Sequence, residues 1–153
     1  MLLEAEECQL VLVDYQSRLM PAIADGPTVL ANAVRLARMA QALGVPMTAT
    51  EQNPDKLGAS AAELGAVLTE AGARVLSKMA FSACADGLIE TLRPAPRKPA
   101  QGGNARSLPK HLQKAVPESA PVQGTIVIAG VEAHVCLLQT ALELLEEEFD
   151  VWV

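Results

Sequence analysis

Three residues of different chemistry, Asp14, Lys78 and Cys136, each stand at or shortly after the end of an apolar run. The run QLVLVD ends in the aspartate, ARVLSK ends in the lysine, and Cys136 follows TIVIAG by six residues. A thiolate is a nucleophile, a carboxylate can take a proton and return it, and an ammonium group stabilises nearby anions. Together the three groups indicate covalent catalysis by a cysteine.

Each of the three residues also has a plainer interpretation when it is taken alone. A free cysteine is most often a small buried hydrophobe, a lysine at a strand end often lies in solvent, and an aspartate there often caps a turn. The catalytic interpretation makes a further prediction about Cys136, which should lie in the first turn of a helix. The helix dipole and Lys78 should then lower the pKa of its thiol.

Strands and helices alternate along the chain, which predicts the elements that position these groups. We expect strands at 9–14, 45–52, 73–78, 125–130 and 149–153, and helices at 27–43, 60–70, 83–92 and 134–147. Alternation without hairpin signals favours an α/β fold of three layers, α/β/α, with an open and mostly parallel sheet. Ligands of such sheets bind beyond the carboxyl ends of the strands. By this rule, the ligand-binding residues should be found among Asp14, residues 50–52, Lys78 and the turn 130–136.

The last predicted helix, 134–147, has a regular apolar pattern. Leu138, Ala141, Leu142 and Leu145 fall on one face, and the glutamates fall elsewhere. Such a pattern is typical of an amphipathic helix.

Residues 93–123 interrupt the alternation with six prolines, a Gly102-Gly103 pair and room for one helix, SLPKHLQKAV. A connection of this length is either mobile or an active-site cover. Its basic residues have no aromatic residues among them, so we interpret it as a solvated loop. The 153 residues suit one domain, 1–153. The last strand is cut short at Val153, which indicates a truncated C-terminus.

Composition argues against several classes of protein. A net charge of -6 disfavours a nucleic-acid partner. Glutamates stand where a signal peptide has basic residues, and no apolar run reaches the roughly 20 residues of a membrane span. Three cysteines without CxxC spacing indicate reduced thiols in the cytoplasm. We expect no metal and no cofactor, since no histidine or cysteine pair has ligand spacing.

Four motifs, VLVDYQSRLMPAI, TEQNPDKLG, LSKMAFSA and VIAGVEAHVCLLQTALELL, together resemble the isochorismatase-like cysteine hydrolases, and most closely their uncharacterised bacterial and animal branch. The resemblance covers most of the chain except 93–123. It implies a three-layer α/β fold in which Asp14, Lys78 and Cys136 are catalytic. It also implies a cis peptide between Val131 and Glu132, which would bring the N–H groups of Glu132 and Cys136 together as an oxyanion hole.

The same resemblance implies a substrate pocket and sets limits on the reaction. Its polar and aromatic lining would be Gln16, Gln52, Phe81 and His134. Nicotinamidases of the superfamily have a metal-binding histidine after the second strand, where this chain reads TEQNPDK. True isochorismatases lack the cysteine. The missing histidine argues against zinc and nicotinamidase activity, and the presence of Cys136 argues against vinyl-ether cleavage.

The resulting hypothesis is a metal-independent, amidase-type cysteine hydrolase of a small molecule, acting through a thioester and assembled as a homo-oligomer. Two alternatives stay open: a non-catalytic oligomeric scaffold, and a redox-responsive protein in which Cys136 is oxidised. The sequence does not identify the substrate or the number of subunits.

Overall fold

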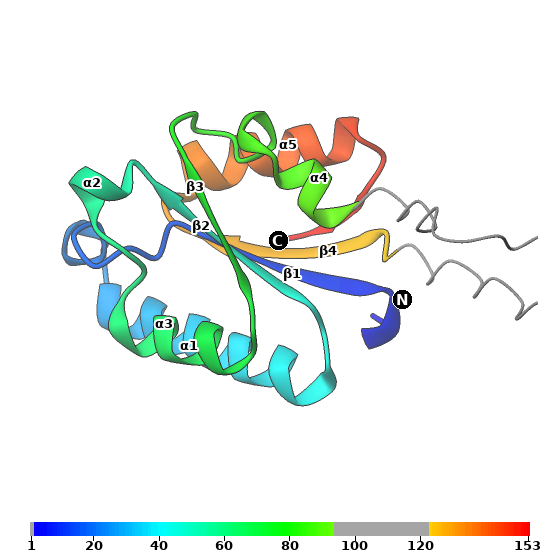
Figure 1. Cartoon of the computed structure of the whole chain (residues 1–153), viewed down its shortest axis with the longest axis horizontal. Helices are drawn as coiled ribbons and strands as arrows, with labels where there is room; N and C mark the ends of the chain where they lie inside the picture. The colour runs from blue at the N-terminus through cyan, green and yellow to red at the C-terminus, as the bar shows by residue number, and fades with distance from the viewer. Residues whose placement is uncertain (1, 94–122) are drawn as a thin grey trace, which may run out of the picture.

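The computed structural model describes residues 2–93 and 123–153, and these form a five-stranded sheet between two helical layers (Figure 1). The strand order is β3-β2-β1-β4-β5, and every neighbouring pair is parallel. The strands are β1 (Cys8–Val13), β2 (Met47–Gln52), β3 (Arg74–Lys78), β4 (Thr125–Gly130) and β5 (Asp150–Trp152). This confirms the predicted α/β/α class and the place of each predicted strand.

The helices lie in two groups on opposite faces of the sheet. In Figure 1, α1 (Gly26–Leu43) and α3 (Ala62–Glu70) cover one face, and α4 (Leu88–Leu92) and α5 (Leu138–Glu146) cover the other. Short helical segments complete the chain: η1 (Ala5–Glu7), η2 (Met20–Ala22), α2 (Pro54–Leu57), η3 (Cys84–Asp86) and the π-helical turn η6 (Ala133–Leu137).

The boundaries of two predicted helices differ from those observed. The helix expected at 83–92 is divided into η3 and α4, because Gly87 between them adopts φ 98°, a left-handed conformation that ends a regular helix. The helix expected at 134–147 begins instead as the π-helical turn and becomes α-helical only at Leu138. The segment SLPKHLQKAV and the irregular stretch around it lie outside the described residues, apart from Arg93 and Gln123.

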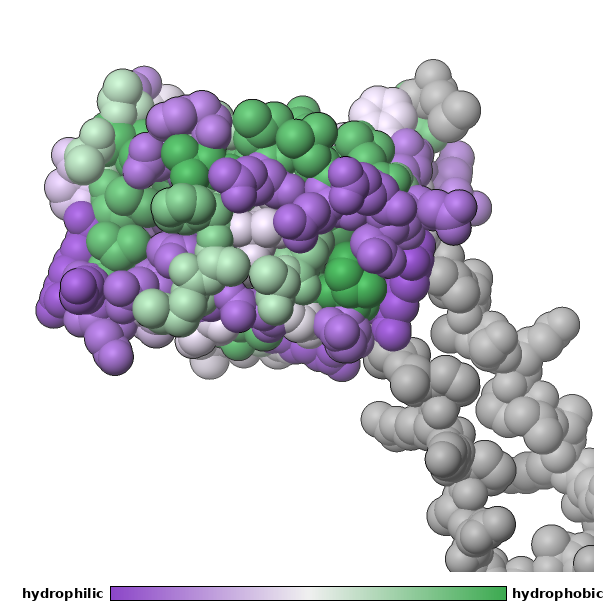
Figure 2. All heavy atoms as spheres, turned by 90° about the horizontal axis from the view of Figure 1, so that it is seen from above, coloured by the Kyte–Doolittle hydropathy of each residue, from purple (hydrophilic) through white to green (hydrophobic). Residues whose placement is uncertain are grey.

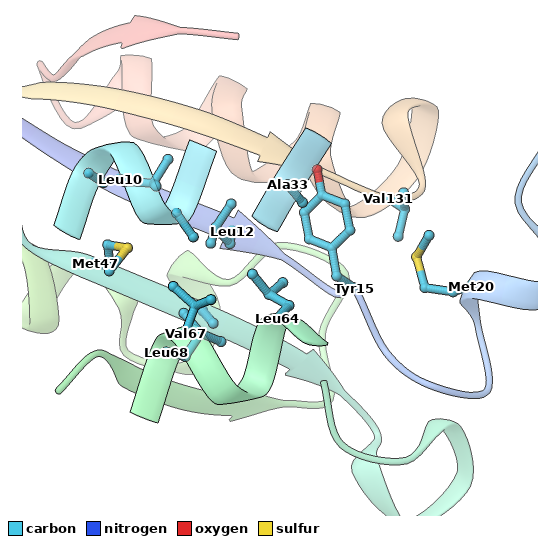
Figure 3. Close-up of a cluster of buried hydrophobic side chains, with 13 residues drawn as sticks. Leu10, Leu12, Tyr15, Met20, Ala33, Met47, Leu64, Val67, Leu68 and Val131 are labelled. Carbon is cyan, nitrogen blue, oxygen red and sulfur yellow. The ribbon is translucent and has the colours of Figure 1, made fainter. Parts of the chain in front are cut away.

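Strand β1 lies at the centre of the sheet, and its sequence explains why. All six of its residues are buried, and a strand buried on both faces favours a nearly continuous apolar run, which CQLVLV provides apart from Gln9. Leu10 and Leu12 belong to the core beneath α1 and α3, which Figure 3 shows together with Leu64, Val67 and Leu68 of α3. The alternate residues Val11 and Val13 belong to a second core beneath α4 and α5.

Strands β1 and β4 approach each other closely at their carboxyl ends. A side chain at Gly130 would place its Cβ 2.5 Å from Val13 Cβ and 2.8 Å from Val13 O, so only glycine fits there. The connection from β1 leads to α1 on one face, and the connection from β4 leads to α5 on the other. The order of the strands therefore reverses at this point, which is where ligands of open α/β sheets bind.

Candidate active site

The structure places Asp14, Lys78 and Cys136 at the carboxyl ends of three strands. Asp14 directly follows β1, Lys78 is the last residue of β3, and Cys136 lies in the π-helical turn after β4. The exposed fraction is 0% for Asp14, 1% for Lys78 and 8% for Cys136. The burial of Lys78 rules out its interpretation as a solvent-exposed lysine at a strand end.

Asp14 is held in an unusual backbone conformation with φ 58°, which non-glycine residues seldom adopt. Its N–H donates to the carbonyl of Thr50, and its own carbonyl accepts the N–H of Gln16. Its side-chain Oδ1 accepts a 2.7 Å hydrogen bond from the Thr50 hydroxyl. These contacts fix both the main chain and the carboxylate plane of Asp14.

The other oxygen of Asp14 has a charge partner but no hydrogen bond. Asp14 Oδ2 lies 2.8 Å from Lys78 Nζ. Yet it is the one buried side-chain nitrogen or oxygen in the described part of the chain that has no hydrogen-bond partner. Lys78 Nζ instead forms hydrogen bonds with oxygens of Gln52, Ala80 and Phe81. Oδ2 is therefore attracted to a cation and keeps its lone pairs available for a proton.

Lys78 is oriented by three oxygens near the end of β3. Its ammonium donates to Gln52 Oε1 at 2.7 Å and to the carbonyls of Ala80 at 3.3 Å and Phe81 at 3.0 Å. A buried lysine without such acceptors would lose much of its charge stabilisation. The loop after β3 thus fixes the position of the ammonium beside Asp14.

The thiol of Cys136 interacts with both members of this ion pair. Burial, first, and the adjacent carboxylate of Asp14 raise the pKa of Cys136 to about 11, although Lys78 acts in the opposite direction. The prediction of a lowered pKa is therefore wrong. Cys136 precedes α5 rather than occupying its first turn, and a desolvated thiol beside a carboxylate holds its proton.

Gln16 and Gln52 both use their side-chain amides inside the protein. Gln16 is fully buried, and its amide donates to the carbonyls of Gln52 and Gly58 and accepts the N–H of Gln52. Gln52 accepts from Lys78 and donates to the carbonyl of Met79. In this arrangement Gln16 positions Gln52, and Gln52 positions the lysine.

Phe81 and His134 lie at the exposed rim of the site. Phe81 is 54% exposed and touches the catalytic centre through its carbonyl. His134 is also exposed, with Nε2 3.8 Å from a carboxylate oxygen of Glu132. The peptide between Val131 and Glu132 is cis, as the resemblance predicts, and the Glu132 N–H donates no hydrogen bond within the described residues.

Thr50 is the site residue to which sequence reasoning assigned no role. The strand-end rule selected the step 50–52, but a threonine in a strand is ordinarily a packing residue. The role of Thr50 could have been inferred only from the register of β1 and β2, in which Thr50 pairs with Val13, the residue before Asp14. Elsewhere, no group of three or more histidine, cysteine, aspartate or glutamate side chains in residues 2–93 and 123–153 could hold a metal ion.

Comparison with known proteins identifies related chains. A model of the isochorismatase domain matches residues 8–99, a span that contains Asp14 and Lys78 and ends before Cys136. Isochorismatase domain-containing protein 2A of Mus musculus is 32% identical over 148 residues, which are 97% of this chain and 57% of the mouse protein. The chain therefore spans just over half the length of this relative.

Two solved structures share the fold over nearly the whole chain. The MAR1 ribonuclease of Caenorhabditis elegans superimposes with a TM-score of 0.75 at 25% identity, over 99% of this chain and 64% of its own. The YcaC gene product of Escherichia coli is described as an octameric hydrolase of unknown specificity. It superimposes with a TM-score of 0.73 at 20% identity, over 97% of this chain and 62% of its own.

Proposed function

Because the chain belongs to the isochorismatase-domain family, as its motifs predict, we propose that it is a metal-independent cysteine hydrolase of a small molecule. It cleaves an amide-type C–N bond through a thioester on Cys136. The observation that carries this proposal is the free hydrogen-bonding capacity of Asp14 Oδ2, a buried carboxylate oxygen beside a protonated thiol. A buried acceptor without a donor is costly, and its use here is to receive the thiol proton.

Acylation begins with transfer of the Cys136 proton to Asp14 Oδ2. The sulfur forms a bond to the substrate carbonyl carbon, and the carbonyl electrons move to its oxygen, which binds the N–H groups of Glu132 and Cys136. When the oxyanion collapses, the C–N bond breaks and the amine leaves with the proton from Asp14. Lys78 keeps the site near electrical neutrality throughout, since its charge balances the carboxylate in the resting state.

Deacylation reverses the roles of the same groups. Asp14 takes a proton from water, the oxygen of that water adds to the thioester carbonyl, and the C–S bond breaks. The departing sulfur recovers the proton from Asp14, and the carboxylic acid product is released. The high pKa of Cys136 suits this cycle, because the thiol is ionised only when Asp14 acts as base.

A panel of small aliphatic and aromatic amides tests the proposal, with amine release as the readout. We expect turnover by the wild-type chain and by Cys84→Ala, and loss of at least about 1,000-fold in Cys136→Ala, as is usual for a removed nucleophile. Equal turnover by Cys136→Ala and wild type would contradict a cysteine mechanism. Oxidation of Cys136 by peroxide in a chain that hydrolyses no amide would favour the redox-responsive alternative.

We also propose that the chain self-associates, with support from the octameric state described for the YcaC gene product. No helix within the described residues is long and apolar enough to cross a membrane. Independently of this, both helical layers expose apolar side chains, which can form contacts between copies.

A further inference from the structure

Helix α5 exposes three leucines of its apolar pattern. Leu138, Leu142 and Leu145 are 47%, 52% and 53% exposed, and their spacing of four and three residues aligns them in one stripe. The buried side of the helix is formed by other residues: Thr140, Ala141 and Leu144. Leu138, Leu142 and Leu145 therefore form a leucine ridge on the molecular surface.

Carboxylates accompany the leucine ridge along one side. Glu146 follows Leu142 by one helical turn and forms no ion pair within the described residues. Figure 2, which views the α4 and α5 side, shows a band of hydrophobic side chains beside a band of hydrophilic ones. Helix α5 contains no lysine or arginine. The ridge and its flank thus form a surface that is apolar and acidic.

A groove with the complementary character lies on the opposite layer. It runs between α1, η2 and the start of α3, has a volume of about 750 Å³ and has apolar walls that include Met20, Leu30 and Val34. Arg35 and Arg38 line the same groove together with one carboxylate, Glu63, which leaves an excess of one positive charge. Within residues 2–93 and 123–153, neither guanidinium lies within 4.0 Å of a carboxylate. We name this surface the α1 groove.

The leucine ridge and the α1 groove cannot meet within one molecule, because the sheet separates their layers (Figure 1). They can meet between two copies. We infer that the leucine ridge of one copy docks in the α1 groove of a second copy, with Glu146 beside Arg35 and Arg38. The inference rests on the proposed self-association and specifies its surfaces. Apolar burial stabilises the contact, and opposite charges select its orientation.

This contact is heterologous: each copy offers its ridge to one neighbour and its groove to another. Repetition of such a contact forms a closed ring, or a fibre if the rotation does not close. Two ridges packed on each other would instead bring the Glu146 carboxylates together, since the nearby Arg93 is already paired with Glu147. Charge complementarity therefore favours the ridge-to-groove contact over a symmetric α5 dimer.

Sedimentation equilibrium of the full chain and its variants tests the inference. The ridge variant is Leu142→Glu, and the groove variant is Arg35→Glu/Arg38→Glu. Leu43→Glu, at an exposed leucine of α1 outside both surfaces, is the matched control. We expect assemblies of wild type and control, and the mass of a single chain for the ridge variant and the groove variant. An equimolar mixture of those two should give a dimer, because one intact ridge and one intact groove remain.

The other results would overturn the inference in distinguishable ways. A wild-type chain that is monomeric at every concentration would disprove self-association. The proposed hydrolase activity would still be tested separately by the amide assay. A monomeric ridge variant with an assembled groove variant points to a symmetric α5 contact. Assembly of both variants places the interface elsewhere. Circular dichroism and thermal melting of each variant establish that the fold is retained.

Discussion

The hydroxyl group of Thr50 donates a 2.7 Å hydrogen bond to Asp14 Oδ1, while the carbonyl of Thr50 accepts the Asp14 N–H. One residue of β2 thus holds the aspartate by both its side chain and its main chain. With Oδ1 committed to Thr50, Oδ2 is the oxygen that faces Lys78 and remains free of hydrogen bonds. In the proposed mechanism, Thr50 is a positioning residue that selects which oxygen receives the thiol proton.

Replacement of Thr50 by valine should therefore slow turnover, since it keeps the shape of the side chain and removes the donor. A hydrogen bond to a charged group contributes about 1.5–3 kcal/mol, so we expect kcat for the best amide of the panel to fall roughly 10- to 150-fold. Thr50→Ser keeps the hydroxyl and should restore most of the rate. Equal rates for the valine and serine variants would show that the hydrogen bond has no catalytic role.

The ionisation of Cys136 provides a test that needs no substrate. Because its pKa is raised to about 11, the thiol should be alkylated slowly at neutral pH, with a rate that rises about tenfold per pH unit towards pH 11. Asp14→Asn removes the carboxylate that raises this pKa, so the alkylation profile of Cys136 should move to lower pH. Peptide mass spectrometry with a small haloacetamide follows each cysteine separately.

Cys84 is an internal control in the same experiment. Burial raises its pKa to about 11 as well, but its charged neighbours are Glu143 and Glu147. Its profile should therefore be unchanged in Asp14→Asn. A Cys136 profile that is equally unaffected, or rapid alkylation of Cys136 well below pH 9 in the wild type, would contradict the described environment of the thiol.

Sequence reasoning was most successful where one residue and its strand end determine the outcome. The apolar runs before Asp14 and Lys78 are long enough to be strands, and the carboxyl ends of parallel strands share one edge. Their convergence follows from topology alone. Thr50 was not assigned, because its role depends on the register of β1 and β2 and on the conformation of Asp14.

The pKa of Cys136 was predicted incorrectly, whereas the apolar pattern of α5 left its packing partner open. Helical periodicity identifies an apolar face but not the layer it meets, and Leu138, Leu142 and Leu145 lie on the surface. Position near a helix start suggested an acidic thiol. Burial and the adjacent carboxylate, which depend on tertiary structure, outweigh that effect.

The ion pair of Lys78 and Asp14 should dominate the local stability, because each group is buried with the other as its charge partner. Removal of one partner from a buried pair costs about 3–5 kcal/mol, so Lys78→Met should lower the free energy of unfolding by that order. Lys56→Met, at an exposed lysine, should change it by less than about 0.5 kcal/mol. Urea unfolding measures both values. A similar small change for both variants would show that the pair is not desolvated.

Gln16 offers a way to separate positioning from substrate contact. Its amide satisfies the N–H and carbonyl of Gln52 and the carbonyl of Gly58, so Gln16→Met should destabilise the fold by about 1–3 kcal/mol. Gln41→Met, at a half-buried side chain of α1, is the control in the same urea series. Unchanged stability together with a raised KM would instead assign Gln16 to the substrate.

The most direct test of a cysteine nucleophile is detection of the acyl group on the protein during turnover. Wild-type chain quenched in acid with an amide of the panel should carry the acyl mass on the peptide that contains Cys136, and hydroxylamine should remove it, as it does from thioesters. Cys136→Ala should carry none. Hydrolysis of the amide without an adduct on Cys136, or with an adduct on another residue, would contradict the proposed mechanism.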